Sequence, residues 1–311
     1  METRTGRLLA EGDGLVSRAQ LLAATGSDST LRAAVRRGEL VRVLHGVYAD
    51  VLLTPDPWLR CRAALFAAPP GSALCGLAAA ALHAPVLDPP SRPTVLVPPD
   101  RRVHRVDVGC SRVAASEAEV VVVDGLRVTS PLRTAVDVAR GPGRRTELIV
   151  VLDALLGATG TSVCQVEDRV AVLADRRPAR GLVRALQLLA EVEPRAGSPM
   201  ESRLRLVLVD GGLPRPRAQI DVHDEQGGWL ACHDLAYPAA RVALEYLGDV
   251  HLQRAVSRKD RRRRNVLALR AGGWVVLDYG GEEVLHRPRL VTGEVEEVLA
   301  VRAPELLLRP R

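Results

Sequence analysis

Three stretches rich in proline and glycine interrupt the chain of 311 residues, and the last two mark boundaries between the predicted regions. They are PPSRP (89–93), GPGRR (141–145) and EPRAGSP (193–199). Because such sequences favour turns and linkers, a single helix or strand is not expected to cross them. We therefore predict a multidomain protein of mixed α/β class (α+β in its arrangement), divided into regions 1–50, 51–140, 141–196 and 197–311.

The composition excludes several classes of protein. Hydrophobic residues make up 47% and charged residues 26%, as in ordinary globular proteins. No apolar run approaches the roughly 18 residues of a membrane span, and the first residues, METRTGRLLAEGDG, lack the apolar stretch of a secretory signal. The five cysteines are scattered and form no CxxC pair, which favours free thiols and a cytoplasmic location.

The positive charge of the chain is concentrated near its end. The formal net charge is +6, and the segment 254–264 carries seven basic residues against one acid. Such a concentration attracts polyanions, and a helix here would place Arg258 and Arg262 on one side as candidate DNA contacts. The alternative is a solvated basic helix face without a partner.

The first 50 residues have the pattern of a winged helix-turn-helix. Ser17 can cap one short helix, and a second is expected from about Asp28, as its N-cap, to Arg37, where glycine follows. The stretch ELVRVLHGVYA alternates as a β-hairpin does, with His45 and Gly46 at its turn.

The second of these helices has two distinct faces. Leu31, Ala34 and Val35 share an apolar face, while other positions carry the candidate DNA-binding residues of this helix, Arg32, Arg36 and Arg37. A recognition helix needs this arrangement, with one face packed on its domain and a basic face turned to the groove. Arg42 and His45 would lie on the wing, near phosphates. A small domain that binds protein is the alternative.

The segment SRAQLLAATGSDSTLRAAVRRGELVRVLHGVYA resembles the N-terminal winged-helix domain of AbiEi-like antitoxins from type IV toxin–antitoxin systems. The stretches GLAAAALH (76–83) and DGLRVTSPLRTAVDVAR (124–140) are similar to the region that follows this domain in related bacterial proteins. The resemblance implies DNA binding and autoregulation, and residues 141–196 are expected to form a helical connector.

Three carboxylates in the last third of the chain are candidates for chemistry. Glu201 opens a predicted helix, Asp234 lies in a predicted strand, WLACHDLAY, and Glu245 lies in the next one, ARVALEYLG. Acids in half-buried strands are costly unless they are solvated, paired or metal-bound. Asp234 and Glu245 are the expected ligands of Mg²⁺ or Mn²⁺, and His251 could transfer protons. Acids at strand ends that serve structure alone are the alternative.

Residues 198–290 are similar to PD-(D/E)XK endonuclease-like domains, relatives of very-short-patch-repair endonucleases. Their pattern consists of a helix Glu, a Leu-Pro-x-Pro run with a Gln, a strand Asp, a strand Glu and a downstream His. The matching residues here are Glu201, Leu213, Pro214, Pro216, Gln219, Asp234, Glu245 and His251. The resemblance implies a restriction-endonuclease-like fold that cleaves DNA with a divalent metal.

Two positions depart from that family. Leu247 stands on the same strand face as Glu245, where the family has a polar or acidic residue, and Asp278 stands where a basic residue is common. Two hypotheses follow for the function of the chain, and in both of them its partner is DNA. The chain is a metal-dependent DNA endonuclease, or it is an antitoxin-like regulator with a degenerate nuclease fold. A protein partner, either a toxin or a second copy, is a weaker third possibility.

Overall fold

The computed structural model describes residues 2–101, 105–112, 115–174, 181–248 and 273–308. The chain forms two compact units, and each is described by itself. Unit 1 consists of Met1–Pro142 and Thr161–Leu186, and unit 2 of Gly143–Gly160 and Gln187–Arg311. Residues 141–196, predicted as one helical connector, therefore contribute helices to both units.

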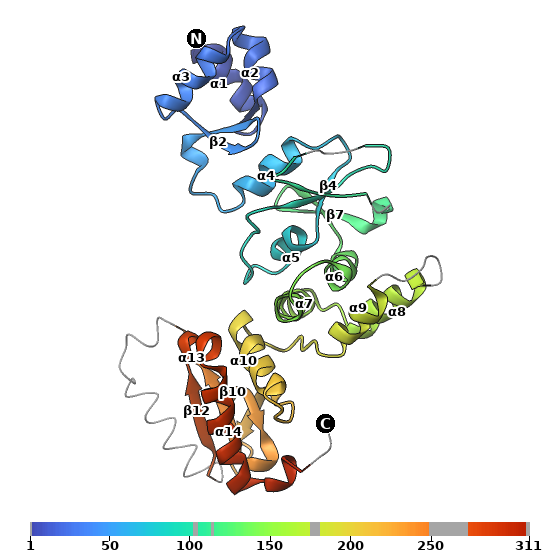
Figure 1. Cartoon of the computed structure of the whole chain (residues 1–311), viewed down its shortest axis with the longest axis vertical. Coiled ribbons are helices and arrows are strands. Elements are labelled where there is room, and N and C mark those ends of the chain that lie inside the picture. Colours follow the sequence, from blue (N-terminus) through green and yellow to red (C-terminus); the bar gives the residue numbers. More distant parts are fainter. Residues whose placement is uncertain (1, 102–104, 113–114, 175–180, 249–272, 309–311) are drawn as a thin grey trace. The chain divides into compact units, whose positions relative to one another are not determined.

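The N-terminal part of unit 1 contains the predicted helix-turn-helix and hairpin (Figure 1). Its elements are α1 (Glu2–Glu11), β1 (Leu15–Ser17), α2 (Arg18–Thr25), α3 (Asp28–Arg36), β2 (Leu40–Leu44) and β3 (Val47–Asp50). The strands form an antiparallel sheet in the order β1-β3-β2. Helix α1 and strand β1 are not predicted from the sequence.

Local capping explains where these helices begin and end. Ser17 caps α2, since its side chain accepts the N–H of Gln20, whose side chain in turn accepts the N–H of Ser17. Gly26 ends the helix in a left-handed conformation. The N-cap of α3 is Ser27, not Asp28 as predicted, because the hydroxyl of Ser27 accepts the N–H of Ser29.

The rest of unit 1 surrounds a mixed five-stranded sheet in the order β6-β5-β4-β8-β7, in which the pairs β4–β8 and β5–β6 are parallel. Its elements are the 3₁₀ turns η1 (Val51–Leu53) and η2 (Glu117–Glu119), the helices α4 (Leu59–Phe66), α5 (Leu77–His83), α6 (Pro131–Arg140) and α8 (Val163–Ala174), and the strands β4 (Ala73–Cys75), β5 (Thr94–Leu96), β6 (Gly109–Ser111), β7 (Val120–Val123) and β8 (Leu126–Thr129). Helix α9 (Leu182–Leu189) passes from this unit to the other.

The hairpin β2–β3 shares a hydrophobic core with the five-stranded sheet. Val43, Leu44 and Val47 are buried in one cluster with Leu74 and Val95 of the larger sheet. Val43, Leu44 and Val47 lie around the turn of the hairpin, so the hairpin is anchored there by apolar burial. The winged helix is therefore packed on the middle region through its wing.

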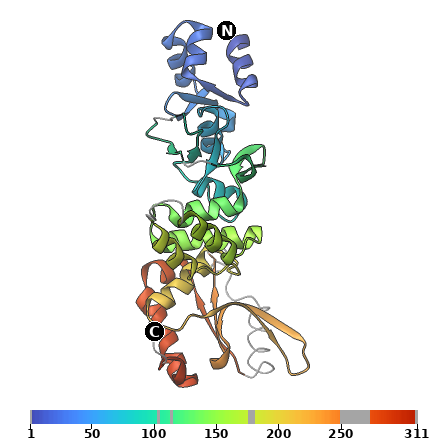
Figure 2. The ribbon, with the colours of Figure 1, turned by 90° about the vertical axis from the view of Figure 1, so that its right-hand side faces the viewer.

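Unit 2 is an α/β unit around a four-stranded sheet in the order β12-β11-β10-β9, with β11 and β12 parallel. Its elements are α7 (Arg145–Thr159), α10 (Pro199–Asp210), β9 (Arg217–His223), β10 (Trp229–Tyr237), η3 (Pro238–Ala240), β11 (Val242–Tyr246), β12 (Val275–Tyr279), α13 (Gly281–His286), α14 (Pro288–Arg302) and η4 (Pro304–Leu306). Helices α10, α13 and α14 cover one face of this sheet (Figure 2).

These observations confirm the predicted class, a multidomain mixture of α and β. The predicted helix at Glu201 and the two predicted strands around Asp234 and Glu245 correspond to α10, β10 and β11. Within the described residues no single helix combines the length and the apolar composition of a membrane span, and one bent pair of helices passes that test together.

Candidate nucleic-acid interface and carboxylate cluster

Helix α3 has the two faces expected of a recognition helix. Leu31 and Ala34 are buried in a small core with Val16, Leu21 and Leu40. The prediction for the third apolar residue of this face was wrong. Val35 is 38% exposed and lies outside this core.

Arg32 and Arg36 of α3 and Arg37, which caps its C-terminus, lie on the exposed side, and acids beside them contact two of the three. Arg32 lies 3.4 Å from the carboxylate of Asp28, and Arg37 lies 2.6 Å from that of Glu39. Arg36 is exposed, in the last turn of the helix. These ion pairs are solvated and therefore weak, so phosphate could replace the carboxylates.

Arg18 belongs to the same surface, although sequence reasoning did not select it. Its guanidinium donates two hydrogen bonds to Asp28, at 3.1 and 2.8 Å, and thereby links the start of α2 to the start of α3. The sequence feature that could have identified Arg18 as part of this surface is its position directly after the capping Ser17. A basic residue at that position projects from the same end of the helix pair as Asp28.

The wing carries the other two predicted residues. Arg42 is exposed on β2, and its Nη2 atom lies 2.8 Å from Nδ1 of His45 at the turn. The turn also contacts the segment before β6, since Asp107 accepts the N–H of His45 at 2.5 Å. The wing is therefore held against the middle region on one side and exposed on the other.

In unit 2 the three predicted carboxylates lie close together. Register places Asp234 of β10 opposite Glu245 of β11, because the neighbouring pair is Leu235 and Leu244. The buried Glu201 lies near them at the start of α10. Burial and the negative charges of Glu201 and Glu245 raise the pKa of Asp234 to about 6, while the N–H of Tyr246 acts in the opposite direction.

Each of these carboxylates is hydrogen-bonded to the protein itself. Glu201 accepts the N–H of Gly197 and the side-chain amide of Gln219, both at 2.8 Å. Asp234 accepts the N–H of Tyr246 at 2.9 Å. The remaining acid, Glu245, lies 2.8 Å from Nδ1 of His233, and the His233 side chain is fully buried.

Two unusual residues hold these acids in place. Gln219 has a φ of 49°, a left-handed conformation that costs a residue with a side chain on the order of 1 kcal/mol. Its amide binds Glu201, and its oxygen lies 3.4 Å from the sulfur of Cys232. His233, which sequence reasoning missed, packs against Trp274 with ring centroids 5.5 Å apart and the ring planes tilted by 33°. The sequence signal was a histidine beside Asp234 in an otherwise apolar strand.

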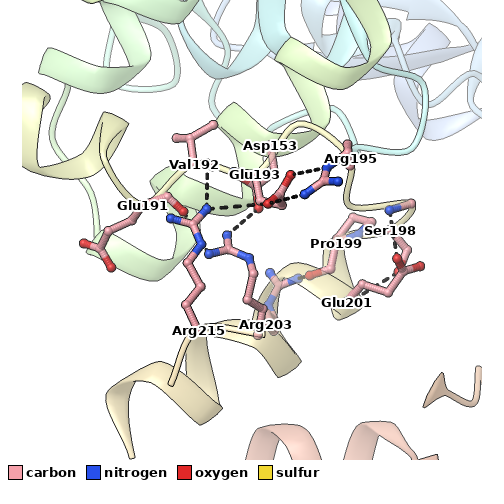
Figure 3. A network of polar contacts seen from close by, with 12 residues as sticks. Asp153, Glu191, Val192, Glu193, Arg195, Ser198, Pro199, Glu201, Arg203 and Arg215 are labelled. Atoms are coloured by element: carbon pink, nitrogen blue, oxygen red, sulfur yellow. Dashed lines mark hydrogen bonds and ion pairs between the residues drawn. The ribbon is translucent and has the colours of Figure 1, made fainter. Parts of the chain in front are cut away.

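A second polar network fixes the segment before α10 (Figure 3). Arg205 and Asp153 form an ion pair of 2.8 Å in which both side chains are 1% exposed, and Asp153 also accepts the N–H of Glu193. Arg215 donates to the carbonyl of Val192 in the same segment. These contacts attach α7 and residues 191–198 to α10, and so fix the backbone that leads to Gly197.

The described residues do not fit a bound Mg²⁺ as they stand. Among them, no three side chains of His, Cys, Asp or Glu form a group that could hold a metal ion. Leu247 is partly buried beyond the end of β11, and its N–H donates to the carbonyl of Tyr279. Asp278 lies beside Glu245 in the β11–β12 register, so that position adds a further acid. His251, Arg258 and Arg262 lie outside the described residues.

Comparison with known proteins identifies the N-terminal two thirds of the chain. Residues 7–49 match the family described as "Transcriptional regulator, AbiEi antitoxin", and residues 72–191 match "AbiEi antitoxin C-terminal domain". The chain belongs to the AbiEi antitoxin family. The expected resemblance of the first 140 residues is thus confirmed, and no match supports the PD-(D/E)XK resemblance of the last third of the chain.

Relatives of this chain occur in Mycobacterium tuberculosis. The proteins MT2308 (strain CDC 1551 / Oshkosh) and Rv2248 (strain ATCC 25618 / H37Rv), both described as uncharacterized, are each 34% identical to it over an alignment of 270 residues. The alignment covers 82% of this chain and 90% of theirs. The crystal structure of the RV2827C protein from the same organism is 24% identical, with a TM-score of 0.41, and covers 65% of this chain and 79% of that chain.

Proposed function

We propose that this chain is a DNA-binding transcriptional regulator of the antitoxin type. One observation carries the proposal: α3 packs Leu31 and Ala34 on its domain and leaves Arg32 and Arg36 exposed, within a segment that matches a family of transcriptional regulators. In a winged helix this face enters the major groove, while the wing contacts the flanking backbone. The function thus corresponds to the regulator hypothesis of the sequence analysis.

The test is binding to the DNA upstream of the protein's own gene. We expect the full-length protein to shift this duplex, and the double variant Arg32→Ala/Arg36→Ala to bind at least about tenfold more weakly, since base and phosphate contacts are each worth about 1–3 kcal/mol. A matched control removes Arg140, an exposed arginine of the same unit in the last turn of α6. Equal binding by the double variant and the wild type would refute the proposal.

The carboxylate cluster supports a regulator without catalytic activity. Glu201, Asp234 and Glu245 are already engaged by an amide, a backbone N–H and an imidazole, which lowers their capacity to bind a cation. In this proposal unit 2 has a structural or partner-binding role. The partner is DNA, and a toxin or a second copy remains a further proposed partner.

A metal-dependent DNA endonuclease is the second candidate function. It is favoured by the raised pKa of Asp234, which reflects first the burial of this carboxyl and then the negative charges of Glu201 and Glu245 near it. Mg²⁺ or Mn²⁺ would have to displace the protein partners of Asp234 and Glu245. Incubation of plasmid with the protein and Mn²⁺ separates the two functions: nicking that disappears in Asp234→Ala supports the endonuclease, and no nicking supports the regulator.

A further inference from the structure

The turn of the wing is bound by a loop of the middle region. Asp107 accepts the N–H of His45 at 2.5 Å, and the guanidinium of Arg105 donates to the carbonyl of the same residue. Both backbone groups at the tip of the wing are thus occupied by residues that lie about sixty positions later in the chain. The loop before β6 and the wing form one surface.

This surface continues to the recognition helix through direct contacts. The backbone N–H of Arg18 donates to the carbonyl of Gly46 at 2.9 Å, which places the start of α2 beside the turn of the wing. The side chain of Arg18 pairs with Asp28 at the start of α3, and Arg32 pairs with the same carboxylate. A path of direct contacts therefore connects Arg32 to the wing and to Arg105.

Arg105, Val106 and Asp107 of this loop have different environments. One carboxylate oxygen of Asp107, Oδ1, is buried without a hydrogen-bond partner among the described residues, so this acid lies beneath the turn and holds it from inside. Val106 is 87% exposed, so the tip of the loop is in solvent. Arg105 is half-buried and uses one of its five N–H donors on His45. The other donors suit the oxygens of a phosphate.

We propose that Arg105 binds a DNA phosphate beside the wing, so that the middle region is part of the DNA interface of this protein. The inference rests on the proposed function as a DNA-binding regulator. Arg42, His45 and Arg105 converge on one turn, and the two arginines supply the positive charge that a phosphate needs there. The winged helix alone would then lack one of its backbone contacts.

The salt dependence of DNA binding tests this inference. Fluorescence anisotropy with the upstream duplex is measured from 50 to 300 mM salt for the wild type and Arg105→Gln, in which an amide can still donate to His45. Loss of one phosphate contact is expected to reduce the slope of log K against log salt by about 0.9 and to weaken binding about three- to tenfold at 150 mM salt. Arg105→Lys, which keeps the charge, should retain most of the slope.

Arg140→Gln provides the matched control, because Arg140 is an exposed arginine of the same unit in the last turn of α6. It should leave the slope unchanged. An unchanged slope in Arg105→Gln would overturn the inference, and weaker binding with an unchanged slope would assign Arg105 to positioning of the wing only. If the Arg32→Ala/Arg36→Ala variant loses binding in the same assay, the proposed function stands independently of Arg105.

Discussion

At the scale of one residue, the burial of Asp234 raises its pKa and thereby makes the stability of unit 2 depend on pH. Its pKa of about 6 lies above that of an aspartate in an unfolded chain, near 3.9. The folded state therefore binds the proton more tightly, and ionisation penalises folding as the pH rises from about 4 through 6. We expect Asp234→Asn to remove this penalty and to stabilise unit 2 by about 1–2 kcal/mol at pH 7.5, where one pKa unit corresponds to 1.36 kcal/mol.

The measurement is urea unfolding at pH 4.5 and 7.5, followed by the fluorescence of Trp229 and Trp274 in a Trp58→Phe background, since Trp58 is the third tryptophan of the chain. The difference between Asp234→Asn and its parent should be larger at pH 7.5. A difference that is the same at both pH values would mean that Asp234 titrates normally.

Asp28 is expected to weaken DNA binding, because its carboxylate competes with DNA for two arginines. Its carboxylate pairs with Arg18 and Arg32. In Asp28→Asn both guanidinium groups can bind phosphate without first breaking an ion pair, so we expect DNA affinity to rise about two- to fivefold at low salt. Glu11→Gln removes the same charge from the exposed pair with Arg7 and should change affinity much less. Weaker binding by Asp28→Asn would show that the acid orders the surface for DNA.

At the scale of elements, the buried pair Arg205–Asp153 connects α10 to α7. Both side chains are 1% exposed, and removal of one partner leaves a buried charge uncompensated. We expect Arg205→Met to destabilise unit 2 by about 3–5 kcal/mol in urea unfolding. The double variant Arg205→Met/Asp153→Asn should recover part of this loss, because asparagine is neutral and still accepts the N–H of Glu193. A single-variant cost below about 1 kcal/mol would refute this account.

The elements themselves were largely predictable from local sequence. Ser17, the glycines after each helix and the alternation around His45 define α2, α3 and the β2–β3 hairpin, and the strands around Asp234 and Glu245 follow from their alternating apolar residues. Hydrogen bonding within a few residues decides these features. Strand β1 has only three residues, too few for a periodic signal, and its position depends on pairing with β3.

The contacts between elements could not be predicted in the same way. The bonds from His45 to Arg105 and Asp107 join residues that only the folded chain brings together, and no short motif encodes them. The proximity of the three acids was predicted, whereas their hydrogen-bond partners were not. The pairing of His233 with Glu245 and the left-handed φ of Gln219 depend on packing across the sheet.

At the scale of the whole molecule, the shared core makes the winged helix dependent on the middle region. Val43, Leu44 and Val47 are at most 8% exposed, in a cluster with Leu74 and Val95. A fragment of residues 1–55 would expose these side chains, each of which contributes about 1.5–3 kcal/mol when buried, and a domain of about that size has little stability in reserve. We expect the fragment to be mostly unfolded by circular dichroism and not to bind the upstream duplex, whereas the full-length protein binds it.

Replacement of Val43 and Val47 by threonine in the fragment would reduce aggregation without restoring DNA binding, because the contacts of the wing turn with Arg105 and Asp107 are absent. A folded fragment that binds DNA as tightly as the full-length protein would show that the wing is stable by itself, and would also contradict a role for the middle region in the interface.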